Sequence, residues 1–131
     1  MAKITGVGGA FLKAKDPAAL YAWYEQHLGI RRAEHGSFVF EKSSVTGATV
    51  LAFFREDTDH FGSGGQRAML NFRVDDLDGL LNAMAAAGVK VDPKRDTYDD
   101  YGKFGWFTDP EGNRVELWEP LGAALEADSG A

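Results

Sequence analysis

The sequence predicts an α+β protein in which one β-α-β-β-β motif occurs twice. Two helical patterns carry this prediction, because each follows an aspartate that suits a helix N-cap, Asp16 or Asp76, and each stops at a glycine, Gly29 or Gly88. Short alternating segments, which are typical of strands, flank both helices. The 131 residues are enough to build one domain with one hydrophobic core.

In the first motif, residues 6–14 alternate small or apolar side chains and predict a strand. Pro17 suits the first turn of the helix that follows Asp16. The apolar side of this helix consists of Leu20, Tyr24 and Leu28. Three strands are then expected over residues 30–34, 37–42 and 48–54.

The second motif begins after the glycine-rich residues 61–65. Residues 68–74 predict a strand, and the helix after Asp76 has an apolar stripe made of Leu77, Leu80, Leu81 and Met84. Further strands are expected over residues 89–91, 103–108 and 113–119. The polar stretch 92–101 is either a solvated loop or a lid in which Tyr98 or Tyr101 reaches a ligand.

These patterns predict one domain over residues 1–131. It consists of a first module, 4–54, and a second module, 68–119, joined by a linker, 55–67, and followed by a tail, 121–131.

The composition excludes several classes of function. A formal net charge of −6 argues against binding of nucleic acid or of an anionic membrane surface, and no apolar run is long enough to cross a bilayer. The chain has no cysteine, so disulfides and thiolate chemistry are excluded, and a cytoplasmic location is expected.

The two-residue period of a strand assigns side chains to faces of the sheet. If Leu70, Phe72 and Val74 pack on the second helix, Met69, Asn71 and Arg73 lie on the opposite face. The same reasoning puts Phe11, Glu116 and Trp118 on the faces that the helices do not cover. We call this expected helix-free surface the trough face.

The last hairpin makes the prediction of the trough face more specific. A five-residue loop, 109–113, would pair Thr108 with Arg114, and would therefore place Trp106 opposite Glu116 and Phe104 opposite Trp118. This register collects aromatic rings around one carboxylate. The alternative is that the two tryptophans are only packing residues of the sheet.

The doubled motif and the segments KDPAALYAWYEQHLGI and FTDPEGNRVELWEP resemble the glyoxalase/bleomycin resistance protein/dioxygenase (vicinal oxygen chelate) superfamily. The resemblance covers the chain from about Ile4 to Pro120. It implies two βαβββ modules that form a cupped mixed sheet, and a homodimer paired through strand edges. It does not choose a reaction, because the superfamily contains lyases, dioxygenases, epimerases, thiol transferases and non-catalytic drug-binding proteins.

In the metalloenzymes of this superfamily, the resemblance implies one metal ligand on the first and on the last strand of each module. Glu116 takes the last of these four positions, but the others fall at or near Gly9, Met69 and Leu51 or Ala52, which are unsuitable ligands. We therefore expect no cofactor and disfavour a divalent metal. Of the three histidines, only His60 is placed to swing to the mouth of a cavity.

The favoured hypothesis is metal-independent binding of a small, cationic or aromatic molecule, with Glu116 as the polar anchor. The expected ligand-binding residues are Phe11, Met69, Asn71, Arg73, Tyr101, Phe104, Trp106 and Trp118. The alternative is an enzyme, such as a lactoylglutathione-lyase-like lyase or isomerase or a dioxygenase. Its Glu116 would hold part of a metal site, completed by substrate, water or a loop group such as His60, or it would act as a general base. A third reading is a degenerate fold kept for partner binding, with side chains filling the trough.

Overall fold

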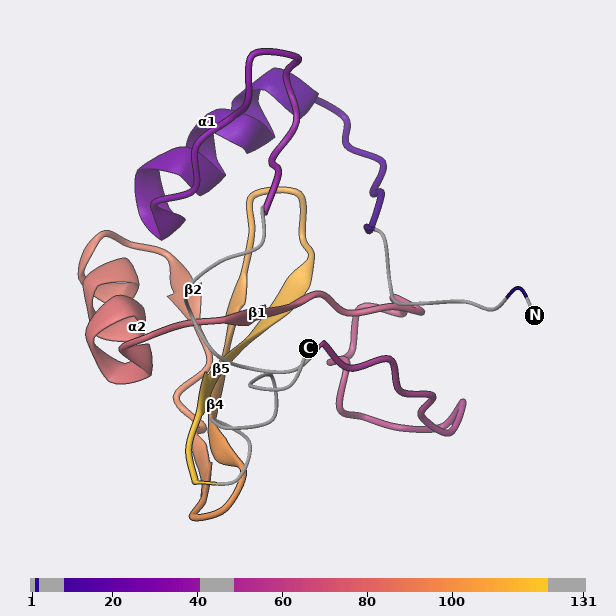
Figure 1. Cartoon of the computed structure of the whole chain (residues 1–131), viewed down its shortest axis with the longest axis vertical. Helices are drawn as coiled ribbons and strands as arrows, with labels where there is room; N and C mark the ends of the chain where they lie inside the picture. The colour runs from indigo at the N-terminus through magenta and orange to yellow at the C-terminus, as the bar shows by residue number, and fades with distance from the viewer. Residues whose placement is uncertain (1, 3–8, 41–48, 123–131) are drawn as a thin grey trace.

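The computed structural model describes residues 2, 9–40 and 49–122. The described elements are α1 (Pro17–Leu28), β1 (Asn71–Arg73), α2 (Leu77–Ala86), β2 (Lys90–Val91), β3 (Asp96–Tyr98), β4 (Gly102–Thr108) and β5 (Arg114–Pro120) (Figure 1). Two helices and a five-stranded mixed sheet confirm the predicted α+β class. In these described ranges no helix is long and apolar enough to cross a membrane.

Both helices begin at the predicted caps. The Asp16 carboxylate accepts a hydrogen bond from the backbone N–H of Ala19, and the Asp76 carboxylate accepts one from that of Gly79. Such bonds satisfy backbone donors that the first turn leaves without an intrahelical partner. Helix α1 ends at Gly29, whose φ of 69° is the left-handed conformation that glycine adopts without a steric penalty.

The sheet has the order β1-β5-β4-β2. Strand β3 pairs with the beginning of β4, and β2 pairs with its end, on the same edge of β4. Strands β1 and β5 are parallel, and the other pairs are antiparallel. In the β4–β5 ladder Trp106 lies opposite Glu116, and Phe104 lies opposite Trp118. The hairpin register predicted from the loop length is therefore confirmed.

Part of the polar stretch 92–101 forms a strand, which the sequence analysis did not predict. Residues Asp96–Tyr98 pair with β4, and the backbone N–H of Tyr101 bonds to the carbonyl of Tyr98 to close the turn. The apolar pattern was not informative here because the strand DTY is short and has one aromatic side chain. These residues form a strand because their backbone pairs with that of β4.

The first motif differs from the prediction. Within its described residues, the strand-type pairing consists of a single bridge between Arg32 and Phe38, and residues 9–14 and 49–54 form no regular strand. Phe11 and Phe53 are 99% and 92% exposed. Alternation identifies a segment that can form a strand, but a strand also needs a neighbour for its backbone groups. The remaining parts of the strands expected over 6–14, 37–42 and 48–54 lie outside the described residues.

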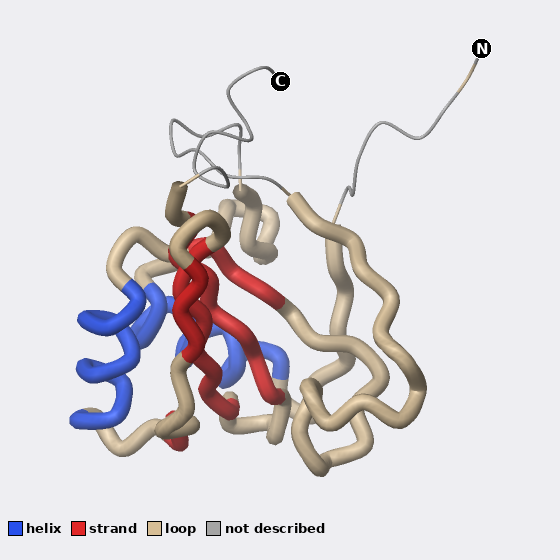
Figure 2. Tube along the Cα trace, turned by 90° about the horizontal axis from the view of Figure 1, so that it is seen from below, coloured by secondary structure: helices blue, strands red, loops and turns tan. Residues whose placement is uncertain are grey.

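Helix α2 covers one face of the sheet, and its apolar stripe is the centre of the core. Leu77, Leu81 and Met84 are fully buried with three sheet residues, Phe107, Val115 and Leu117. Figure 2 shows long loops on the side of the sheet away from this helix. The sheet therefore separates a packed face from the face that carries Glu116.

The β4–β5 turn connects the hairpin to α1. The Asp109 carboxylate accepts the Tyr24 hydroxyl at 2.8 Å, the backbone N–H groups of Glu111 and Asn113, and the Asn113 side-chain amide. The Glu111 carboxylate accepts the backbone N–H groups of Lys15 and Asp16 just before the helix. Burial and the hydrogen bond to Asp109 raise the pKa of the Tyr24 phenol well above its ordinary value.

We expect Tyr24→Phe to lower the free energy of unfolding by about 1–2 kcal/mol at neutral pH, because it removes a buried hydrogen bond. The effect should shrink above about pH 10. There the unfolded phenol of the unsubstituted chain ionises while the folded phenol stays protonated, so that chain loses stability as the pH rises. Urea unfolding near pH 7 and near pH 11 tests this, with the exposed Tyr98→Phe as control. An equal difference at both pH values would contradict it.

Gly105 provides a second test of the packing. A methyl group at Gly105 would collide with the Cδ1 atom of Leu81 on α2. We expect Gly105→Ala to destabilise the fold by about 1–3 kcal/mol through overpacking. Gly64→Ala, where a methyl group meets open space, should change the free energy of unfolding by less than about 0.5 kcal/mol. Similar midpoints of thermal unfolding for both variants would contradict the packing of α2 on β4.

Candidate functional site

Glu116 lies in the middle of β5 on the face away from α2. Its two sheet neighbours are Asn71 on β1 and Trp106 on β4. The residue is only 7% exposed. A carboxylate buried to this extent needs hydrogen-bond donors, because burial removes it from water.

Three side chains supply those donors. The Asn71 amide donates to Oε1 at 2.6 Å, and the Trp106 indole N–H donates to Oε2 at 3.0 Å. The His60 Nε2 atom lies 2.9 Å from the same Oε2. A carboxylate accepts about four hydrogen bonds, so Glu116 keeps capacity for one more partner among these contacts.

His60 reaches this carboxylate from the loop before β1. Its ring stacks on Phe54 with a centroid distance of 5.0 Å and an interplanar angle of 6°, and it meets Trp106 edge-on at 5.8 Å. From the sequence we expected that His60 could swing to a cavity mouth and, in the metal form of an enzyme, complete a metal sphere with Glu116, but we predicted no direct contact between the two side chains. The two residues are 56 positions apart, and no local spacing connects them.

An aromatic wall lies beside Glu116 on the same face. We use this term for Phe104, Trp118 and Tyr101. The Phe104 and Trp118 rings are parallel within 2° at 6.1 Å, and Tyr101 stacks against both at 5.9 and 5.5 Å. The Trp118 indole N–H donates to the Tyr101 carbonyl, which holds the wall together. Tyr101 is 49% exposed, so the wall has an edge in solvent.

The structure thus brings together Asn71, Trp106, Glu116 and the three residues of the aromatic wall. Arg73 lies opposite Trp118 in the β1–β5 register, and Met69 lies two residues before Asn71 and is partly buried. Phe11 is not part of this group in the described structure, because its side chain is almost fully exposed. That these residues bind a ligand stays a prediction.

Cations already occupy the surroundings of Trp106. The Arg114 guanidinium lies 5.1 Å and the Lys94 ammonium 5.7 Å from the centroid of the indole ring. Arg114 also pairs with Asp92 at 3.1 Å. The backbone N–H of Lys94 and this guanidinium lower the pKa of Asp92. Trp106 therefore contributes to the site as the hydrogen-bond donor to Glu116. The aromatic wall, through Tyr101, has more ring surface in contact with solvent than Trp106 has.

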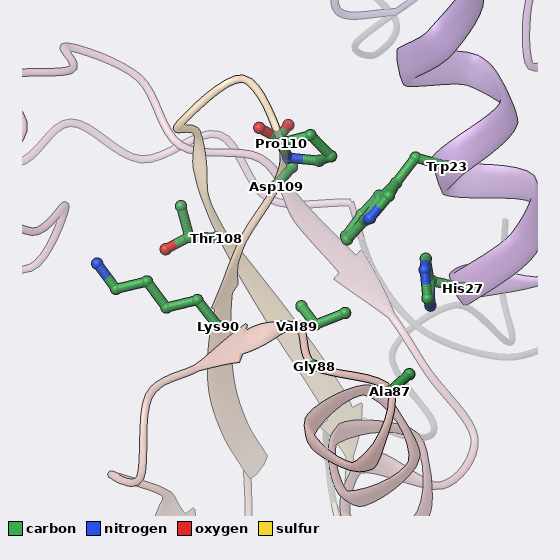
Figure 3. A pocket seen from close by; sticks show the side chains of 9 residues that line it. All are labelled: Trp23, His27, Ala87, Gly88, Val89, Lys90, Thr108, Asp109 and Pro110. Atoms are coloured by element: carbon green, nitrogen blue, oxygen red, sulfur yellow. The ribbon is translucent and has the colours of Figure 1, made fainter.

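A separate cavity of about 270 Å³ lies on the helix side of the molecule (Figure 3). Trp23 and His27 of α1 line one side of it, and Val89 and Pro110 lie across from them. The one buried carboxylate in its lining, Asp109, is already bonded to Tyr24 and to the β4–β5 turn. This cavity has less convergent chemistry than the surroundings of Glu116.

The residues around Glu116 do not fit a metal centre. Glu116 and His60 are two potential ligands, whereas a catalytic zinc site normally has three protein ligands. Of the other expected positions, Leu51 is 71% exposed and Gly9 has no donor atom. No group of three or more histidine, cysteine, aspartate or glutamate residues is arranged for metal binding in the described part of the chain.

Comparisons with known proteins agree with this fold. TnmS3, an antibiotic-binding protein from Streptomyces sp. CB03234, has a TM-score of 0.57 and 22% identity, covering 92% of this chain and 99% of TnmS3. TioX from Micromonospora sp. ML1 has a TM-score of 0.52 and 16% identity, covering 82% and 93%. Lactoylglutathione lyase from Agrobacterium tumefaciens has a TM-score of 0.56 and 18% identity, covering 89% and 95%.

A search of curated proteins found no match. A family model does match, and it covers residues 7–117. Because this match includes both helices and nearly all of the sheet, the chain belongs to the Glyoxalase/Bleomycin resistance protein/Dioxygenase superfamily.

Proposed function

We propose that this protein binds a small planar aromatic cation against the aromatic wall, with Glu116 as the anchor for the positive charge. One observation carries the proposal: the Glu116 carboxylate is only 7% exposed and lies beside three stacked rings. It accepts hydrogen bonds from two uncharged donors on the neighbouring strands, Asn71 and Trp106.

The physical argument concerns charge in a partly desolvated place. Neutral donors stabilise the Glu116 carboxylate without cancelling its charge, so a cation nearby gains more attraction than it would in water. The faces of aromatic rings also attract cations and stack on planar groups. A ligand with a positive charge on a flat ring would pair with the Glu116 carboxylate and stack on the partly exposed Tyr101 ring.

The comparisons support a binding function without identifying the ligand. TnmS3 is described as an antibiotic-binding protein, and it shares the fold over nearly its whole length. At 22% identity this similarity supports only the class of function, which is the capture of a small organic molecule.

The second candidate is an enzyme of the same superfamily, a lyase, isomerase or dioxygenase, in which Glu116 would hold part of a metal site or act as a general base. The contact of 2.9 Å between His60 and Glu116 favours it, because such a pair can exchange a proton with a substrate. The lyase from Agrobacterium tumefaciens, which has the same fold, supports this class as well. Metal content after incubation with Zn²⁺, Mn²⁺ or Ni²⁺ tests the metal form of this candidate: about one ion per chain, released by Glu116→Gln, would favour a metalloenzyme.

The binding proposal predicts that charge selectivity depends on Glu116. We expect the chain to bind 10-methylacridinium more tightly than neutral acridine at about pH 8, measured by fluorescence titration. Glu116→Gln should weaken binding of the cation by about tenfold or more and leave acridine almost unchanged. Tyr101→Ala should weaken both probes, because it removes a stacking surface.

Glu56→Gln is the matched control, because it removes an equal charge from an exposed side chain that pairs with Arg67. Equal binding of the cation by the Glu116→Gln and Glu56→Gln variants would contradict the proposal. Near-ultraviolet circular dichroism checks that each variant keeps its tertiary packing.

We further propose that the chain forms a homodimer through its first motif. Large apolar side chains are exposed there, including Phe11, Leu51 and Phe53, and such surfaces commonly mark an interface. Phe53→Asp should shift the sedimentation coefficient from dimer to monomer, whereas Tyr98→Asp, in the second motif, should not. A monomer at all concentrations of the unsubstituted chain would refute this.

The lack of cysteine supports the cytoplasmic location expected from the sequence.

A further inference from the structure

The three donors to Glu116 differ in how they are held. Asn71 and Trp106 lie on strands that pair with β5, so the sheet fixes their backbone positions next to Glu116. His60 comes from a loop. Its side chain is 32% exposed, and Asn71 is exposed as well, so the place of each donor in the fold distinguishes them rather than exposure. His60 is the donor of the three whose movement would leave every strand of the sheet in place.

The backbone of His60 is anchored independently of its ring. Its carbonyl accepts a hydrogen bond from the Arg114 side chain at 3.3 Å, and its N–H donates to the Thr58 hydroxyl at 3.1 Å. Among the described residues, the ring makes one hydrogen bond, to Glu116, stacks on Phe54 and meets Trp106 and Phe61 at an angle. Rotation of the side chain would therefore break one hydrogen bond and these ring contacts, and it would leave the hydrogen bonds of the loop backbone in place.

We propose that His60 is a displaceable cover of the Glu116 carboxylate, and that a cationic ligand must replace its imidazole at Oε2. This inference rests on the proposed function and adds a regulation to the same site. A protonated imidazole would compete with the ligand as one cation with another, whereas a neutral imidazole would offer only a hydrogen bond. Affinity for a permanent cation should therefore rise with pH.

Charged groups face His60 and Glu116 from several elements of the fold. Beside Glu116, Arg114 contacts the His60 carbonyl and pairs with Asp92, and Lys94 lies near Trp106. Two further groups are Asp59, next to His60 in the chain, and Arg73, two residues along β1 from Asn71. Histidine is the side chain that ordinarily gains or loses charge between about pH 5 and 8, whereas arginine, lysine and carboxylates ordinarily keep theirs.

The test uses 10-methylacridinium, whose charge does not depend on pH. We expect the affinity of the unsubstituted chain to rise about tenfold between about pH 5.5 and pH 8. At the lower pH, the His60→Ala variant should bind the probe about tenfold more tightly than the unsubstituted chain does. The affinity of this variant should be the same at both pH values. His60→Gln keeps an uncharged N–H donor, so it should also lose the pH dependence. His35→Gln, a histidine that contacts Ser37, should keep it.

The outcomes separate this inference from the proposed function. If Glu116→Gln abolishes the preference for the cation but the His60 variants keep the original pH dependence, the site binds cations and the cover does not exist. If His60→Ala weakens binding at both pH values, His60 is a positioning residue and the inference is wrong. If only the His60→Ala variant binds the probe, the cover is supported although the unsubstituted chain fails. If no variant binds it, both proposals fall.

Discussion

The Asp109 carboxylate is the constraint on which the arrangement of the site depends. It accepts two backbone N–H groups and one amide of its own turn, so that turn can close in one way. A strand shifted by one residue would send every side chain to the other face. The same carboxylate accepts the Tyr24 hydroxyl, so the element that sets the register of β4 and β5 also positions α1.

The register leads directly to the chemistry of Glu116. On the α2 side, the sheet contributes Phe107, Val115 and Leu117, and the close contact of Leu81 with Gly105 leaves no room for a polar group. On the other side, the same alternation presents Trp106, Glu116, Phe104 and Trp118, and Tyr101 stacks on the last two from the turn before β4. A buried carboxylate is costly unless hydrogen bonds compensate it, and here two of those bonds come from neighbouring strands. The sheet therefore preorganises a negative charge in place.

Much of the fold and the centre of the site could be predicted, because they depend on local rules. Capping residues, helical periodicity and a five-residue loop predict both helices and the pairing of Trp106 with Glu116. Contacts between distant parts of the chain could not be predicted this way. The bonds from Tyr24 to Asp109 and from His60 to Glu116 span 85 and 56 residues, and β3 depends on pairing with β4. Alternation over residues 49–54 likewise does not specify a partner strand.

The N–H donors and cations around Glu116 are an unfavourable environment for a metal ion. A metal site would need further anionic or neutral ligands around the carboxylate, but Asn71 and Trp106 present N–H groups, which repel a metal ion. Arg114 and Lys94 already lie near the Trp106 ring, so a new cation has less to gain there. The exposed edge of the aromatic wall at Tyr101 has the same attraction for a cation and more contact with solvent. The proposed ligand, flat and with delocalised charge, would gain from these rings, whereas a compact, strongly hydrated ion would gain little from them.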